Sequence, residues 1–278
     1  MGAPSRSSAR LVKRMANTAG RSEGGRQGCT IPGASSSPSQ EPALVAKIAF
    51  KALGKSASQE KQPNEYVAGQ EAGMGFYGER VLPRIINAAC GTKTVEPLRR
   101  RVCGGLAGDV VEIGFGSGLN VPFYPAAVTR VTAVEPSDVG WKLAARRLRA
   151  TAVPVQRSGL DGQSLPFADN SYDAALSTWT LCTIPDVTAA LAEVRRVLKP
   201  GGTLHFLEHG LAPDERVRRW QRRLDPLEQR IAGGCHFTRP VIDLLTTAGF
   251  SIQELEVFYE KGAPKFAGAD SIGTAMSP

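Results

Sequence analysis

The sequence has little of what identifies disulfide-rich, metal-binding or membrane-spanning proteins. Its 278 residues include only five cysteines, which are widely scattered and form no Cys-x-x-Cys pair. We therefore expect neither a disulfide framework nor a metal site, and the pattern fits a reducing compartment. No stretch approaches the roughly 18 consecutive apolar residues that a spanning helix needs. With 42% hydrophobic residues, the chain can still bury a sizeable core.

An excess of positive charge outside the N-terminal segment is also missing. The formal net charge is +8, but residues 1–40 hold six Lys and Arg side chains against Glu23 alone. The rest of the chain carries 28 basic and 25 acidic residues, so it is close to neutral. A nucleic-acid partner is therefore not expected.

Composition divides the chain into three segments. Residues 1–42 are rich in Gly, Ser, Pro and Arg, and we predict a disordered basic tail. Residues 43–65 are predicted to hold a short amphipathic helix and a linker, and this helix permits peripheral membrane contact at most. Residues 66–278 are predicted to form one folded domain in the cytoplasm.

A strand that runs into a glycine loop is the most informative stretch of this domain. Residues 110–113 are typical of a buried strand, and Gly114, Gly116 and Gly118 follow at every second position. Side chains there would keep a ligand away from the backbone, whose free N–H groups can face an anion. Glu135 ends a second expected strand 21 residues after Gly114. At that offset a carboxylate reaches the ribose hydroxyls of a bound nucleotide.

Strands and helices alternate through the rest of the domain, which predicts an α/β fold with a parallel sheet covered on both faces. The expected strands are residues 110–113, 131–135, 153–156, 173–177, 203–207 and 251–258, and the expected helices are 76–86, 139–150, 187–198, 215–231 and 238–248. Thr238 should cap the last helix, and Pro226 should bend or divide the 215–231 helix. The three arginines at 99–101 are interpreted as a solvated helix face.

Four segments in order resemble the motifs of class I S-adenosylmethionine-dependent methyltransferases with a type 11 methyltransferase domain. They are Glu-Ile-Gly-Phe-Gly-Ser-Gly at 112–118, Val-Glu-Pro-Ser at 134–137, the stretch from Leu165 to Asp173, and the stretch from Leu191 to Gly202. The resemblance implies a doubly wound, mostly parallel seven-stranded sheet whose last strand is antiparallel. It also implies S-adenosylmethionine as cofactor, with contacts from Glu112, Gly114, Gly116, Gly118, Glu135, Asp161 and main-chain groups near Thr178.

A narrower resemblance, to the methyltransferase-like branch that includes alkyl thiol methyltransferases, rests on residues 206–209 and 233–239. Methyl transfer by direct displacement to a small, fairly apolar acceptor is the predicted reaction, and a thiol, a quinone-like compound and other metabolites all remain open. His209 follows the fifth expected strand at the ligand end of the sheet, so it is the first candidate for a general base. His236 and Glu208 come next, and a structural role is open for each of the three.

The substrate pocket is expected to include Tyr77, Trp179, Cys182 and Cys235. The 215–231 helix has apolar residues at helical spacing, and it is expected to cover an apolar substrate, to pack on the sheet edge, or both. Two alternatives stay open. An NAD(P)-dependent oxidoreductase is disfavoured because the Gly-x-Gly-x-Gly spacing departs from Gly-x-Gly-x-x-Gly. A nonenzymatic S-adenosylmethionine-binding or RNA-associated module would bind the cofactor without transferring its methyl group.

Overall fold

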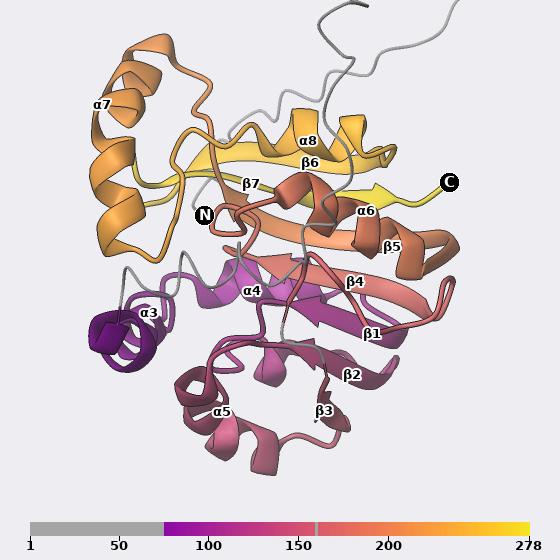
Figure 1. Ribbon diagram of the computed structural model, residues 1–278. Coiled ribbons are helices and arrows are strands. Elements are labelled where there is room, and N and C mark those ends of the chain that lie inside the picture. Colours follow the sequence, from indigo (N-terminus) through magenta and orange to yellow (C-terminus); the bar gives the residue numbers. More distant parts are fainter. Residues whose placement is uncertain (1–74, 159–160) are drawn as a thin grey trace, which may run out of the picture. The chain divides into compact units, whose positions relative to one another are not determined.

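The structure, a computed structural model, describes residues 75–158 and 161–278 (Figure 1). The predicted tail (1–42) and the predicted amphipathic helix and linker (43–65) lie outside these residues and stay predictions. The strands are β1 (Gly108–Ile113), β2 (Val128–Val134), β3 (Val155–Arg157), β4 (Tyr172–Thr178), β5 (Leu198–His209), β6 (Ser251–Tyr259) and β7 (Ala269–Met276). The helices are η1 (Tyr77–Val81), α3 (Leu82–Ala89), α4 (Glu96–Cys103), η2 (Val121–Phe123), α5 (Asp138–Ala150), α6 (Val187–Val197), α7 (Glu215–Ile231) and α8 (Val241–Thr247).

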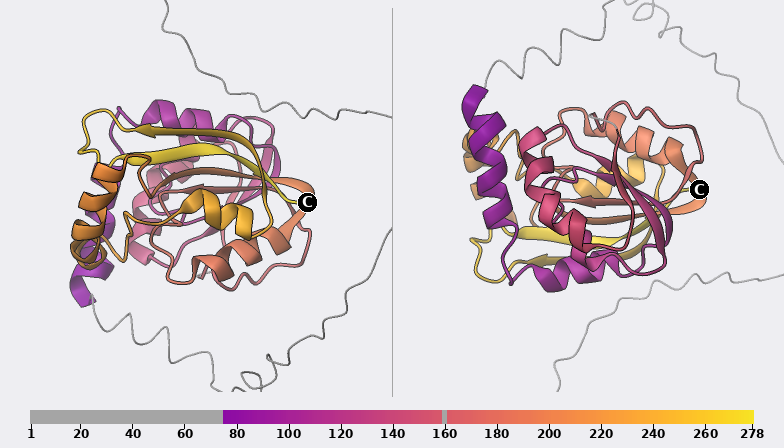
Figure 2. Two further views of the ribbon diagram at one scale, coloured as in Figure 1. Left: turned by 90° about the horizontal axis from the view of Figure 1, so that it is seen from above. Right: turned by 90° about the horizontal axis from the view of Figure 1, so that it is seen from below.

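All seven strands belong to one sheet with the order β3-β2-β1-β4-β5-β7-β6. The first five strands pair in parallel, and β7 pairs antiparallel with both β5 and β6. Helix α4 covers one face of the sheet, while α6 and α8 cover the other (Figure 2). The predicted doubly wound, seven-stranded fold is therefore confirmed, including its antiparallel last strand.

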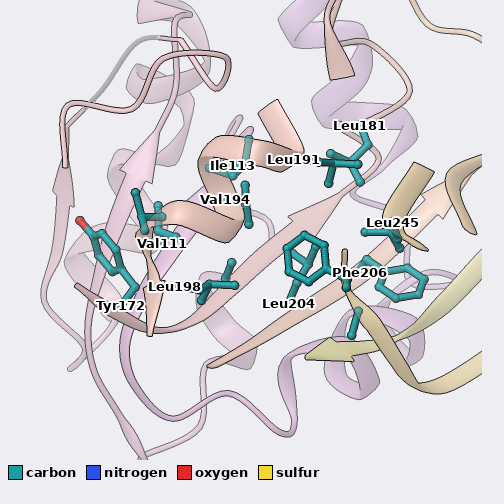
Figure 3. Packing of buried hydrophobic residues seen from close by; sticks show 14 of the residues in the cluster. Val111, Ile113, Tyr172, Leu181, Leu191, Val194, Leu198, Leu204, Phe206 and Leu245 are labelled. Carbon is teal, nitrogen blue, oxygen red and sulfur yellow. The ribbon is translucent and has the colours of Figure 1, made fainter. Parts of the chain in front are cut away.

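The hydrophobic core explains why the central strands read as continuous apolar runs. Val111 and Ile113 on β1 point to the face that α6 covers, where they pack with Leu191 and Val194 (Figure 3). Val110, one residue out of phase, packs on the opposite face with the residues of α4. A parallel sheet that is buried on both faces needs apolar side chains at every position, so alternation is lost.

Strand β7 was not predicted from its own residues, because its sequence mixes polar side chains with glycine. Gly273 lies where a Cβ atom would clash with the backbone carbonyl of Glu254 and would come 2.9 Å from the ring of Phe206. Glycine is therefore the residue that lets β7 fit between its two neighbours. Its antiparallel direction follows from the short connection after β6.

One prediction about the C-terminal helices was wrong; for α7 only the predicted division is excluded, and the bend at Pro226 stays a prediction. Helix α7 is one element with Pro226 inside it, so the proline does not divide it. A single missing N–H removes one hydrogen bond, and the remaining turns continue the helix. Helix α8 begins at Val241 with Pro240 at its N-cap, and no side chain caps it. Thr238 lies outside this helix, where its backbone N–H donates to Asp225 Oδ1 at 3.2 Å.

Helix α7 packs on the body of the protein through polar side chains, contrary to the predicted apolar face. Gln221 is 1% exposed, and its amide accepts a hydrogen bond from the Ala212 N–H and donates to the Gly210 and Phe266 carbonyls. Trp220, on the predicted apolar face, is instead 56% exposed. Unpaired backbone groups after β5 need partners, and Gln221 supplies them. Within the described ranges, no helix is long and apolar enough to cross a membrane.

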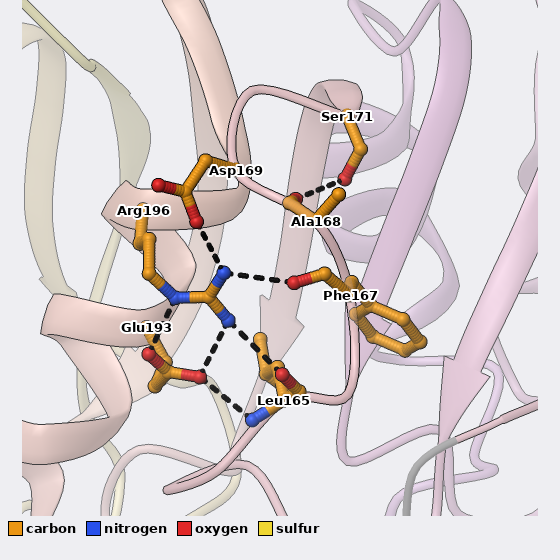
Figure 4. A network of polar contacts seen from close by, with 7 residues as sticks. All are labelled: Leu165, Phe167, Ala168, Asp169, Ser171, Glu193 and Arg196. Carbon is orange, nitrogen blue, oxygen red and sulfur yellow. Dashed lines mark hydrogen bonds and ion pairs between the residues drawn. The ribbon is translucent and has the colours of Figure 1, made fainter.

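The arginine Arg196 on α6 fixes the loop that leads into β4. Its guanidinium donates to the carbonyls of Leu165 and Phe167 and pairs with Asp169 and Glu193 (Figure 4). Glu193 also accepts a hydrogen bond from the Leu165 N–H at 2.8 Å. One planar side chain with five donors thereby holds a segment that has no regular structure of its own.

We expect Arg196→Met to lower the free energy of unfolding by about 2 kcal/mol, because several hydrogen bonds of roughly 1 kcal/mol each are lost from a partly exposed site. The control is Arg195→Met on the same helix, whose guanidinium donates a hydrogen bond to the Ala248 carbonyl at 3.2 Å. Urea unfolding of both variants measures the difference. Equal effects of the two substitutions would show that the network does not hold the loop.

Candidate active site

The loop after β1 leaves its backbone open at one glycine. At Gly116, which has φ of +58°, a Cβ atom would meet only the Gly114 carbonyl, at 3.9 Å. At Gly118 a Cβ atom would lie 3.1 Å from Ala144 and from two other side chains, so this glycine serves packing within the loop. Gly114 is covered by the side chain of Thr180. Of the three predicted glycines, Gly116 therefore has the geometry for close approach of a ligand.

Glu135 lies beside this open backbone, as its position in the sequence predicted. Its carboxylate accepts hydrogen bonds from the N–H groups of Gly116 and Ser137, the second at 2.6 Å. Burial raises the pKa of Glu135, while these two backbone bonds and the nearby Arg157 lower it. A carboxylate held next to an open glycine loop can accept hydrogen bonds from a ribose diol, so the two features fit a nucleoside.

Asp161, predicted to contact an adenine amino group, follows directly after residues that the structure leaves undescribed. Its Oδ1 atom accepts hydrogen bonds from the backbone N–H and the side-chain amide of Gln163, at 2.8 and 3.0 Å. Gln163 in turn accepts a hydrogen bond from the Asp186 N–H at 2.8 Å. These contacts fix the direction of the Asp161 carboxylate, and its role toward adenine stays a prediction.

A buried polar network lies behind the glycine loop and includes Glu112. The Asn120 amide donates to Glu112 Oε1 and to Thr178 Oγ1, both at 2.9 Å, and the Tyr124 hydroxyl also donates to Glu112. Burial raises the pKa of Glu112 to about 7, although the hydrogen bonds from Tyr124 and Asn120 and the charge of Arg99 oppose this. Glu112 and Thr178 thus share a network that supports the loop from below.

The interpretation of residues 99–101 as a solvated basic face was wrong for Arg99, which is only 4% exposed. Its guanidinium donates to Asn120 Oδ1 at 2.6 Å and to the Cys90 carbonyl at 3.1 Å, and it lies 4.8 Å from the centre of the Trp179 ring. Sequence alone gave no signal for this burial. An arginine run looks the same whether one member points inward or all point to solvent.

Glu208, the third candidate for acid–base chemistry, holds the chain that follows β4. It is fully buried and accepts hydrogen bonds from the Ser177 hydroxyl at 2.6 Å and from the Thr180 N–H at 2.9 Å. Burial raises its pKa to about 7, and these hydrogen bonds lower it. Between the two donors, Trp179 has a positive φ of 49°. Glu208 therefore stabilises a strained turn at the candidate site.

His236, the second candidate, is held by helix α7. Its Nδ1 lies 3.0 Å from the Gln229 amide and 3.3 Å from Asp225 Oδ2. Asp225 is 7% exposed and also accepts from the Thr238 N–H. His236 is thus part of the contact between α7 and the following loop.

Two cysteines and His209 meet where β4 and β5 end. The sulfur of Cys235 lies 3.7 and 3.8 Å from the two ring nitrogens of His209, and Cys182 completes a group whose ligand atoms are all within 4.8 Å of one another. The hydrogen bond from Cys182 and the charge of His209 lower the pKa of the Cys235 thiol, despite its burial. The same interaction raises the pKa of Cys182. Atoms of this kind at such spacing can hold a soft metal ion.

Asp270 is a polar residue at this site that the sequence did not single out. It lies opposite His209 in the β5–β7 register and accepts a hydrogen bond from the Trp179 ring N–H at 3.3 Å. Its second oxygen is buried without a hydrogen-bond partner among the described residues. Because β7 was not predicted from the sequence, neither was this neighbour of His209.

The structure thus brings some of the predicted residues into two groups. Gly116 and Glu135 form the first group, while Cys182, Cys235 and His209 form the second, with Trp179 between α4 and Asp270. Tyr77, predicted to line the pocket, donates its hydroxyl to the Ile231 carbonyl at 2.8 Å and is 38% exposed. Its place in a substrate pocket stays a prediction. Arg99, Asn120, Tyr124, Thr180 and Asp270 are site residues that sequence analysis missed.

Comparisons with known proteins show which proteins this chain resembles. Residues 111–206 match the family model described as Methyltransferase domain. Thiol S-methyltransferase TMT1B of Rattus norvegicus is 35% identical over 151 residues, which cover 53% of this chain and 62% of the rat protein. Phthiotriol/phenolphthiotriol dimycocerosates methyltransferase 1 of Mycobacterium ulcerans (strain Agy99) is 33% identical over 124 residues, 43% of each chain. This chain therefore spans less than two thirds of the length of these relatives.

A solved structure supports the same fold. A SAM-dependent methyltransferase from Thermotoga maritima superposes with a TM-score of 0.52 at 23% sequence identity, and the match covers 72% of this chain and 100% of that one. The likeness concerns the overall fold. An NAD(P)-dependent oxidoreductase, the first alternative, is not favoured by these likenesses.

The buried Glu112 predicts how stability depends on pH. Its pKa of about 7 in the folded protein lies above the ordinary value of 4.5, so the stability that its protonated form contributes is complete below pH 4.5. That contribution is lost as the pH rises through 7. The side chain of Glu112→Gln is neutral at every pH. When the pH is raised from 4.5 to 8, the free energy of unfolding of this variant should therefore fall by about 3 kcal/mol less than that of the wild type.

Urea unfolding of both proteins at the two pH values measures this difference, because all other titrating groups are shared. Glu256→Gln, on the exposed part of β6, is the control and should behave like the wild type. Parallel pH profiles of the wild type and Glu112→Gln would contradict the prediction.

Proposed function

Because residues 111–206 match the model of a methyltransferase domain, we propose that the protein transfers the methyl group of S-adenosylmethionine to the thiol of a small, fairly apolar acceptor. The observation that carries the cofactor is the carboxylate of Glu135 held beside the open backbone of Gly116. The thiol is favoured because sulfur and imidazole side chains gather where β4 and β5 end, and because the rat relative is a thiol S-methyltransferase.

The cofactor fits the residues present. S-adenosylmethionine supplies a methyl group on a positively charged sulfonium, which a nucleophile takes by direct displacement. Glu135 would accept hydrogen bonds from the ribose hydroxyls, Gly116 would let the cofactor approach the loop, and Asp161 would face the adenine amino group. The main task of the chain is then alignment, because a well-oriented pair of reactants reacts far faster than a free one.

Among the three predicted acid–base residues, we place His209 at the acceptor. Glu208 and His236 already have hydrogen-bond partners that hold chain segments, so we assign positioning roles to both. His209 instead faces the sulfur of Cys235, and it is the last residue of β5, at the end of the sheet where ligands bind in this architecture. A thiol acceptor would approach the same end from the side of Cys182 and Cys235.

We propose as well that α3 and α7 rest on an anionic membrane surface, from which an apolar acceptor could enter. Trp220, Leu227 and Ile231 lie on one face of α7 and are 56%, 55% and 48% exposed. Figures 1 and 2 show α3 beside α7, and the exposed Ile85 and Ile86 extend the apolar surface onto α3. Arginines flank this surface, as is typical of interfacial helices.

The first test uses labelled S-adenosylmethionine with an alkyl thiol, a phenol and a quinol as acceptors. We expect a labelled methyl thioether, and at least about tenfold weaker cofactor binding by Glu135→Ala, since two hydrogen bonds to the ribose exceed the 1.4 kcal/mol of a tenfold change. Glu256→Ala, an exposed carboxylate on β6, should bind like the wild type.

Calorimetric titration measures the binding. If the wild type gives no heat of binding with S-adenosylmethionine, the proposed cofactor is wrong, and so is the proposed methyl transfer. Binding with methylation of only the phenol or quinol would keep the enzyme and change its acceptor. Binding without methylation of any acceptor would favour the nonenzymatic module.

The membrane proposal predicts that the protein sediments with vesicles of anionic phospholipid and much less with zwitterionic ones. The double variant Trp220→Ser with Leu227→Ser should lose at least about tenfold in partitioning, because roughly 1.5–3 kcal/mol is lost for each large apolar side chain no longer buried. Leu255→Ser, at a residue on β6 that is 44% exposed, is the control. Equal sedimentation of both variants would contradict the proposal.

A further inference from the structure

We propose that Cys182, His209 and Cys235 bind a thiophilic divalent cation such as Zn²⁺, and that the open fourth position of this cation takes the acceptor thiol. The inference rests on the proposed function for the identity of the acceptor, and the metal site itself stands on the geometry of the three side chains. They come from three distant segments: Cys182 follows β4, His209 ends β5, and Cys235 lies between α7 and α8. The absence of a Cys-x-x-Cys pair therefore says nothing about this site.

The distances are close to those of a tetrahedral site. With Zn–S bonds of about 2.3 Å and Zn–N bonds of about 2.1 Å, neighbouring sulfur and nitrogen ligands lie about 3.6 Å apart, and two sulfurs about 3.8 Å apart. Cys235 Sγ lies 3.7 and 3.8 Å from the two ring nitrogens of His209, so neither nitrogen alone is aimed at the sulfur, and a rotation of the imidazole would turn one of them toward the cation. All ligand atoms of the three residues fall within 4.8 Å. Shifts of about 1 Å or less, within reach of side-chain rotation, would complete the site.

The backbone around the three ligands is well fixed. The Cys182 carbonyl accepts hydrogen bonds from the His236 N–H at 2.9 Å and from the Arg239 guanidinium at 3.3 Å. Those two bonds tie the segment after β4 to the loop that carries Cys235. Cys182 and Cys235 are only 1% and 4% exposed, so their sulfurs are shielded from bulk water. A site that is preformed in this way spends little binding energy on ordering its ligands.

Asp270 gives a second, independent observation. A histidine that binds a metal through one nitrogen usually donates its other ring N–H to a carboxylate or a carbonyl. Asp270 is the cross-strand neighbour of His209, and one of its oxygens is buried without a partner in the described part of the chain. When one nitrogen of His209 faces the two sulfurs, Asp270 is placed to accept from the other. The site thereby accounts for an oxygen that is otherwise left unsatisfied.

Three protein ligands leave one position open, as in catalytic zinc sites and unlike closed structural ones. A thiol that binds there loses its proton: the S–H bond breaks, a bond between sulfur and the cation forms, and the proton passes to water. The acceptor is then present as a thiolate at the ligand end of the sheet. A methyl thioether has no charge and binds a cation weakly, so the product would leave this position.

The test begins with the full chain, kept under a phosphine reductant, stripped with a chelator and titrated with Co²⁺. We expect one equivalent to bind and to give thiolate-to-cobalt charge transfer together with the intense visible bands of tetrahedral coordination. Cys182→Ala and Cys235→Ala should each weaken the charge-transfer band, because one of the two sulfur ligands is lost, and should bind Co²⁺ at least tenfold more weakly. Cys103→Ala, which removes a buried thiol from the core beside α4, is the matched control and should keep the full spectrum.

Calorimetric titration with S-adenosylmethionine separates this proposal from the proposed function. The three cysteine variants should still bind the cofactor, which also shows that they fold. Adding an alkyl thiol to the cobalt protein should change its visible spectrum, since the thiol enters the fourth position. Cofactor binding without stoichiometric Co²⁺ binding would overturn the metal site and leave the proposed function standing.

Two further results would also overturn it. Retention of the cobalt spectrum by both Cys182→Ala and Cys235→Ala would place the metal elsewhere. A disulfide between these two cysteines that persists in the reductant, seen as two missing thiols in a count on the denatured protein, would show that the sulfurs bond to each other instead. Equal thiol methylation by the metal-free and metal-loaded protein would remove the role of the fourth position.

Discussion

The arrangement of the site depends most on the buried carboxylate of Glu208. It accepts hydrogen bonds from the side chain of Ser177, at the end of β4, and from the backbone of Thr180, two residues beyond that strand. These contacts hold Trp179 in a left-handed conformation that costs about 1–3 kcal/mol for a residue with a side chain. A fully buried carboxylate needs such partners, since burial without them is unfavourable. The burial of the Glu208 carboxylate and the conformation of the turn therefore depend on each other.

From this turn, side chains reach both parts of the site. Thr178 accepts from Asn120, which links the turn to Glu112 beneath the glycine loop, and the Thr180 side chain covers Gly114. Cys182, two residues further, points toward His209 and Cys235. One short segment thus connects the cofactor loop with the sulfur-rich group. A displacement of the turn would change the two together, which suits a reaction whose rate depends on the alignment of two molecules.

The sequence predicted the arrangement around the glycine loop better than the arrangement around Cys182, His209 and Cys235, and the reason is physical. Gly116 and Glu135 follow the adjacent parallel strands β1 and β2, and the carboxyl ends of parallel strands meet at the same edge of a sheet. Arg99 could not be placed, because charge does not reveal which member of an arginine run points inward. For α7 the apolar stripe predicted the wrong buried residue, since Gln221 and not Trp220 packs on the body of the protein. Side-chain pairing across loops leaves no periodic signal.

This difference also explains why the fold alone does not specify the acceptor. The cofactor side consists largely of backbone and one carboxylate, so many sequences can preserve it. The other side consists of side chains that loops deliver from β4, β5 and the segment after α7, and loops vary more than the strands they connect. Two buried sulfurs and an imidazole form a soft, polarisable environment, which matches a sulfur nucleophile better than the hard oxygen of an alcohol. The chemistry of the three side chains, more than the sheet beneath them, argues for a thiol.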